Sequence, residues 1–137
     1  MKKLLFLWLS ISFVVAITTI SFAQADKEIS TPSKYEAIEA NYLTGLNSDN
    51  QGLKVSSAYF LGNMKSSKAV IPLMKMFRNA KNNGAKLVAA WSLLKIGDSR
   101  GVFLVKRESE LDNFSGINPM LHQLYEDYCL KTKGKVE

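Results

Sequence analysis

The chain is poor in cysteine, histidine and proline. A single cysteine, Cys129, excludes a disulfide framework within one chain and a cluster of thiolate metal ligands. A single histidine, His122, excludes most catalytic triads and histidine-rich metal sites. Three prolines and eight glycines in 137 residues exclude a collagenous chain and argue against a disordered one. The length of 137 residues indicates one globular domain, because it does not comfortably allow two.

The first residues have the pattern of a secretory signal peptide. Lys2 and Lys3 precede an apolar run, residues 4–20, that is interrupted only by Ser and Thr. Ala23-Gln24-Ala25 then offers small residues at the two positions that a signal peptidase reads, and Ser21-Phe22-Ala23 is a second option. The start of the chain therefore predicts entry into an export pathway of bacterial type.

We expect export to the periplasm or the medium, with residues 1–25 removed and residues 26–137 left as the mature domain. The exact cleavage site stays open between the two small-residue motifs. The alternative to cleavage is a membrane anchor, because the apolar run approaches the roughly 20 residues that span a bilayer.

The mature part repeats itself with a period of 32 residues. Residues 52–61 align without a gap with residues 84–93, and the match in residue class continues to Ile71 and Phe103. A period of this length indicates a repeat architecture in which each unit buries its apolar face against the next. We expect full repeats at about 50–80 and 82–111, with degenerate flanking helices at about 33–46 and 118–131.

Each repeat has the apolar spacing of two helices. Apolar residues recur at intervals of three and four, as on the buried face of an α-helix, and a short polar turn separates the two stretches. In the first repeat these positions are Val55, Ala58, Tyr59, Leu61, Val70, Leu73, Met74 and Phe77. No stretch alternates between apolar and polar residues as a half-buried strand would, so we predict an all-α fold.

Local signals indicate where the helices begin. Ser33 and Glu36 have the spacing of a capping box. Asp98 or Ser99 can cap the second helix of the second repeat. Asn118-Pro119 places a capping residue before a proline at the expected first helical position.

Two segments carry a resemblance to a known family. The first reads Lys54-Val55-x-x-Ala58-x-x-Leu61-Gly62-x-Met64, followed by Lys68-Ala69-Val70-Ile71-Pro72-Leu73. The second reads Lys86-Leu87-x-x-Ala90-x-x-Leu93-Leu94-x-Ile96-Gly97-Asp98-x-Arg100-Gly101-Val102. They resemble the short HEAT-like repeats of bacteria, also described with the phycobilisome-lyase repeats. The resemblance implies a right-handed α-solenoid of helical hairpins that chiefly binds other proteins. Some members of the family are lyases or act on nucleic acids, but no residue of this sequence matches their active residues.

Positive charge is concentrated in the repeats. Residues 54–107 contain eleven Lys or Arg and a single acidic residue, so their net charge is +10. The flanks, 26–53 and 108–137, each have a net charge of −3. Several basic residues recur at the 32-residue offset, which puts them at equivalent places in neighbouring repeats.

We predict a basic patch that binds an acidic face of a partner protein, with an anionic membrane surface or an envelope polymer as other targets. Lys68 and Lys75 are seven residues apart, which places them on one face of a shared helix, and Arg100 and Arg107 repeat this spacing. The complete candidate patch is Lys68, Lys75, Arg78, Arg100 and Arg107. The alternative is that duplication copied basic residues that only solvate an exposed face. We expect no nucleic-acid partner, because export removes the usual target and no nucleic-acid-binding motif accompanies the charge.

Two other pairs of residues receive a structural interpretation. His122 and Cys129 are two helical turns apart, about 10 Å, which is too far for two ligands to close a metal site. We expect a half-buried histidine and a buried cysteine, although the unpaired Cys129 leaves an intermolecular disulfide open. Tyr59 and Trp91 occupy equivalent repeat positions, and we expect both in the core.

No catalytic motif supports an enzyme. Glu108, Glu110 and Asp112 alternate around a helix end and do not form a spaced catalytic pair. A Gly-rich phosphate loop, a nucleophile elbow and a zinc-binding HExxH are all lacking from the sequence. We therefore predict an exported, non-catalytic protein-binding or scaffold module without a cofactor or metal. The alternatives are a lyase-like HEAT enzyme or enzyme accessory subunit, and a membrane-held scaffold if the signal is uncleaved; the oligomeric state stays open.

Overall fold

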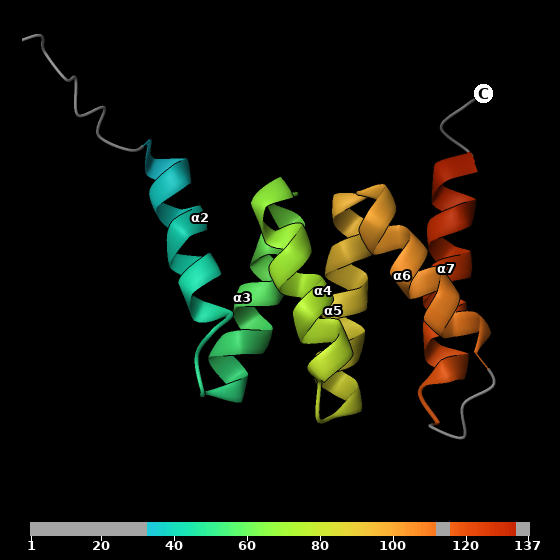
Figure 1. The fold of residues 1–137 in the computed structure, drawn as a ribbon. Helices are drawn as coiled ribbons and strands as arrows, with labels where there is room; N and C mark the ends of the chain where they lie inside the picture. The colour runs from blue at the N-terminus through green and yellow to red at the C-terminus, as the bar shows by residue number, and fades with distance from the viewer. Residues whose placement is uncertain (1–32, 112–115, 134–137) are drawn as a thin grey trace, which may run out of the picture. The chain divides into compact units, whose positions relative to one another are not determined.

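Residues 33–111 and 116–133 are described by a computed structural model of the chain (Figure 1). The predicted signal peptide, residues 1–25, lies outside these residues. Every regular element in the described ranges is a helix, which confirms the all-α prediction. The elements are α2 (Lys34–Gly45), α3 (Gln51–Asn63), the short 3₁₀ helix η2 (Ser67–Ala69), α4 (Val70–Asn79), α5 (Asn83–Ile96), α6 (Ser99–Glu110) and α7 (Asn118–Lys133). None of these helices is both long and apolar enough to cross a membrane.

The capping signals act where the sequence places them. Ser33 accepts a hydrogen bond from the Glu36 amide at 3.2 Å, and the Ser33 amide donates to the Glu36 carboxylate at 2.8 Å, so the predicted capping box is present. Asp98 caps α6 by accepting from the Arg100 amide. Pro72 is the third residue of α4, within the first turn, where a missing amide breaks no intrahelical bond. Helix α7 begins at Asn118, where the second flanking helix is expected, and it includes the residue that the sequence marks as its cap.

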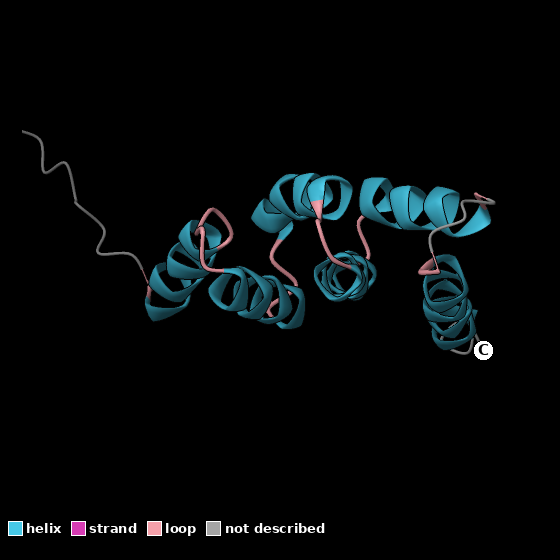
Figure 2. Cartoon of the chain, turned by 90° about the horizontal axis from the view of Figure 1, so that it is seen from below, coloured by secondary structure: helices cyan, strands magenta, loops and turns pink. Residues whose placement is uncertain are grey.

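The helices pack in two layers (Figure 2). Helices α3, α5 and α7 lie on one side and α4 and α6 on the other, with α3–α5, α5–α7 and α4–α6 contacts within the layers. Helix α5 lies at the centre, because it contacts α3, α4, α6 and α7. The connections α2–α3 and α4–α5 lie at the same end of the helices, the lower end in Figure 1.

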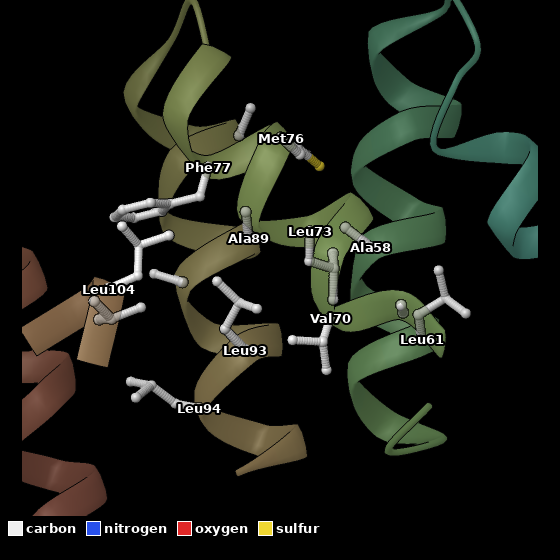
Figure 3. Packing of buried hydrophobic residues seen from close by; sticks show 14 of the residues in the cluster. Ala58, Leu61, Val70, Leu73, Met76, Phe77, Ala89, Leu93, Leu94 and Leu104 are labelled. Atoms are coloured by element: carbon white, nitrogen blue, oxygen red, sulfur yellow. The ribbon is translucent and has the colours of Figure 1, made fainter. Parts of the chain in front are cut away.

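The core is built mainly from aliphatic side chains of helices α3 to α7, together with Met76 and Phe77 (Figure 3). Leu61 of α3, Leu73 and Phe77 of α4 and Leu93 of α5 are almost completely removed from solvent. Burial of each such side chain stabilises the fold by about 1.5–3 kcal/mol. The apolar spacing in the sequence therefore identifies the main contacts between the layers.

Helices α3 and α5 approach each other closely at Gly62. A Cβ atom built on Gly62 would lie 2.8 Å from Cα of Ser92, which is closer than real contacts allow. The Ser92 hydroxyl lies 2.8 Å from the carbonyl oxygens of both Ala58 and Val88. It can donate a hydrogen bond to Ala58 of α3, which links the two helices, or to Val88 of its own helix α5. Glycine in one helix and serine in the next thus set the distance between them.

Candidate functional site

The five residues of the predicted basic patch do not share one environment. Lys68 lies in η2, before α4 begins, so the expectation that it shares a helix with Lys75 is wrong. The cause is the 3₁₀ turn, in which the Ala69 amide donates to the Ser66 carbonyl and the chain winds more tightly than in an α-helix. Arg100 lies in the first turn of α6 and Arg107 in its last turn.

Lys68 and Arg100 already have carboxylate partners. The Lys68 ammonium lies 2.9 Å from Oε2 of Glu39. The Arg100 guanidinium makes two contacts of 3.0 Å with the Asp98 carboxylate, the same group that caps α6. Both side chains therefore have structural roles that do not depend on a partner molecule.

Glu39 is the buried carboxylate of this arrangement. It is only 5% exposed, and it accepts hydrogen bonds from the Ser66 hydroxyl at 2.5 Å and from Lys68. The hydrogen bond from Ser66, followed by the one from Lys68, lowers the pKa of Glu39 below its ordinary value of 4.5, against the opposing effect of burial. These contacts tie α2 to the connection between α3 and α4.

Lys75 and Arg78 of α4 and Arg107 of α6 remain available to other molecules. All three are exposed, and none forms an ion pair with another described residue. Two large apolar side chains accompany them, Ile71 at 57% and Phe103 at 63% exposure, each four residues before a basic one. The outward side of α4 and α6 therefore combines unpaired cations with apolar side chains.

Tyr59 and Trp91 lie at the surface, so the expectation that they belong to the core is wrong. Tyr59 is 45% exposed and Trp91 half-buried, and their rings stack with centroids 4.9 Å apart and an interplanar angle of 14°. Tyr59 and Trp91 occupy equivalent positions of the repeat on α3 and α5, which are adjacent in one layer. Their rings therefore lie side by side, and each covers one face of the other. Phe60 contacts Tyr59 edge-on at 5.6 Å, and the Lys95 ammonium lies 5.6 Å from the Trp91 ring centroid.

This aromatic pair borders an open groove of about 430 Å³ between α3, α5 and α7. Most of its lining is apolar, and Gln123 and Asp127 supply the polar groups. The lining residues are Tyr59, Leu87, Val88, Trp91, Met120, Gln123, Leu124 and Asp127. We call it the aromatic groove. A recess with this lining holds apolar side chains and offers a carboxylate at its rim.

Sequence reasoning missed the aromatic groove for an identifiable reason. Tyr59 and Trp91 continue the apolar spacing of their helices, and position on a helix does not reveal that an open groove between α3, α5 and α7 leaves them partly exposed. Met120 of α7 was the available signal, because it lies about 100° around that helix from the buried Leu121 and is 55% exposed.

His122 and Cys129 are more exposed than expected. His122 is exposed and Cys129 half-buried, because α7 packs with only one side against α5 and α6. Tyr125 lies beside Cys129, and a hydrogen bond with that thiol, together with burial, raises the pKa of Tyr125 to about 12. In the described ranges there is no group of three or more His, Cys, Asp or Glu residues that could hold a metal ion.

Comparison of the chain with models of protein families, with curated proteins and with solved structures gives no match.

Proposed function

We propose that this chain is an exported, non-catalytic protein-binding module built as a short right-handed α-solenoid of HEAT-like repeats. The 32-residue period and the resemblance of its two copies support the solenoid. The pairs α3–α4 and α5–α6 correspond to the two copies, and the equivalent helices α3 and α5, like α4 and α6, contact each other. The positively charged start and apolar run of residues 1–25 support export.

The observation that carries the proposal is the aromatic groove. Contiguous exposed apolar patches on soluble proteins often mark interaction sites, and this groove gathers two stacked aromatic rings and a methionine in one recess. The partner is a protein segment with an aromatic or aliphatic anchor next to a basic residue, because the apolar floor of the groove adjoins the exposed Asp127 carboxylate. Aromatic side chains and methionine dominate the centres of protein interfaces.

The outward side of α4 and α6 is a second candidate surface, for an acidic partner. Ile71 and Phe103 are exposed one helical turn before Lys75 and Arg107, and this combination of unpaired charge with apolar area favours an interface over a purely solvated face. Lys68 and Arg100 are paired with Glu39 and Asp98, so they do not belong to the unpaired charge of this surface.

The test compares two substitutions on α7. Peptides are selected from a random library against the purified protein, and their affinity is measured by fluorescence of Trp91, which is the one tryptophan in residues 26–137. Met120→Glu puts a charge into the groove, and we expect it to weaken binding at least tenfold. Leu130→Glu is the matched control, because Leu130 is 68% exposed on the same helix and does not line the groove.

The selected sequences themselves complete the test. We expect them to share an apolar anchor with an adjacent Lys or Arg, and to bind Leu130→Glu like the unaltered protein. Equal affinity for both variants, with melting curves that show both folded, would exclude the aromatic groove as the binding site.

A further inference from the structure

A second recess in the molecule has a different chemistry. It has a volume of about 470 Å³ and lies where the α2–α3 and α4–α5 connections meet the ends of α3, α4 and α5. Its lining is mainly polar, with Lys54 from α3, Lys75 from α4 and Lys81 from the α4–α5 connection. We call it the lysine cleft. It shares no residue with the aromatic groove.

The lysine cleft concentrates positive charge that the protein does not neutralise. Asp49 is the single carboxylate in its lining, and none of its three lysines forms an ion pair with any described residue. Elsewhere in the described part of the chain, Lys68, Lys86 and Lys106 are each paired with a glutamate. Like charges gathered around a recess repel one another unless an anion occupies it.

The other polar groups of the cleft are suited to the same ligand. Asn47, Gln51 and Asn79 line it with carboxamides, which can donate hydrogen bonds to an anion without adding charge. Gln51 is the first residue of α3, and neither α3 nor α5, which both begin at the cleft, has an acidic residue in its first turn. The positive ends of two helix dipoles therefore add to the field of the lysines.

We propose that the lysine cleft binds a small molecule that carries a phosphoryl group. Three lysines from separate elements line one recess, and a doubly charged phosphate can pair with more of them than a single carboxylate can. The recess is of the size that takes a small ligand, whereas a membrane or nucleic acid requires an extended surface. The proposal stands on the cleft alone, so its failure would leave the aromatic groove and its peptide partner untouched.

Binding is measured by isothermal titration at constant ionic strength with inorganic phosphate, pyrophosphate and glycerol 1-phosphate as separate probes. These arms distinguish free phosphate from a phosphate ester. We expect saturable one-to-one binding of at least one probe. Lys54→Gln, Lys75→Gln and Lys81→Gln should each weaken it at least fivefold, because each removes one charge from the cleft.

Arg78→Gln is the matched control. Arg78 is exposed on the same helix as Lys75, three residues away, and does not line the cleft, so its loss should change affinity less than twofold. An equal loss with Arg78→Gln would show that the anion responds to diffuse charge and would overturn the proposal. Failure of all three probes to bind would overturn it too, as would tighter binding of hexaglutamate, which would make the cleft a site for acidic peptides.

Discussion

Glu39 keeps a negative charge in a place that is almost closed to solvent. Burial of an ionised carboxylate is unfavourable unless hydrogen bonds replace the lost water, and here Ser66 and Lys68 supply them. Ser66 and Lys68 are 27 and 29 positions from Glu39 in the sequence, so these hydrogen bonds form only when α2 is folded against the rest. Glu39 therefore contributes to holding α2 against the rest, together with the hydrogen bond from Tyr35 to the Met64 carbonyl.

The stability of the protein should depend on the ionisation of Glu39. Its pKa is lowered in the folded state, mainly by the Ser66 hydrogen bond, whereas the unfolded chain has the ordinary value of 4.5. The carboxylate thus stabilises the fold above about pH 4.5, and this contribution is lost as pH falls through the lowered pKa. We expect Glu39→Gln to lower the free energy of unfolding at pH 7 by about 1–2 kcal/mol, since a charge-assisted hydrogen bond is lost.

Urea unfolding of both proteins between pH 3 and pH 7 measures this effect. The difference between the unaltered protein and Glu39→Gln should shrink toward pH 3. Glu126→Gln, which removes an exposed carboxylate on α7, is the control and should keep the unaltered pH profile. A constant difference across the whole range would contradict the assigned role of Glu39.

At the scale of the element, the contact between α3 and α5 depends on one missing side chain. Alanine normally stabilises a helix relative to glycine by up to about 1 kcal/mol. At Gly62 the added methyl group would meet the backbone of Ser92 at 2.8 Å, so the two helices would have to move apart. We expect Gly62→Ala to destabilise the protein by about 1–3 kcal/mol, the usual range for an overpacked core.

Gly84→Ala is the control for this prediction. Gly84 lies in the first turn of α5, where an added Cβ would meet only Oδ1 of Asn82, at an ordinary 3.5 Å. Thermal melts should show a lower Tm for Gly62→Ala and an unchanged or higher Tm for Gly84→Ala. A rise in Tm for both variants would contradict this prediction, because it would mean that α3 and α5 can move apart without loss of stability.

The helices were predictable because their signals are local. The capping box of Ser33, the cap of Asp98 and the apolar intervals of three and four lie within a few residues of the element that they specify. The site was predictable only in part, because exposure depends on neighbours that are distant in sequence. Tyr59 and Trp91 have the same spacing as buried residues, and their exposure depends on how α3, α5 and α7 are arranged around the groove.

At the scale of the whole molecule, charges that are separate in the sequence are brought together by the fold. Glu39 and Glu108 belong to the acidic flanks, and they pair with Lys68 and Lys86 of the basic middle segment. The net charge of +10 over residues 54–107 therefore overstates what a partner meets. Counting residues along the chain cannot detect this, since the partners are 29 and 22 positions apart.

Removal of the predicted signal peptide would lower the mass of the chain by an amount that mass spectrometry can detect. When the complete sequence is expressed in a bacterium, we expect periplasmic protein whose intact mass corresponds to a start at residue 26, or at residue 24 if the earlier motif is cut. Replacement of Ala23 and Ala25 by Leu should block this cleavage and leave the chain in the membrane fraction. Recovery of the unaltered chain in the membrane fraction at its full mass would favour the anchored alternative.

The central place of α5 has a consequence for how the fold comes apart. In an array whose units contact only their neighbours, an end can unfold while the rest persists. Helix α2 has its main helix contact with α3, whereas α5 contacts four helices, so detaching α2 is a local event and opening α5 is a global one. We therefore expect α5 and the four helices around it to unfold as one cooperative unit, and a partner in the aromatic groove, bordered by α3, α5 and α7, would stabilise that unit directly.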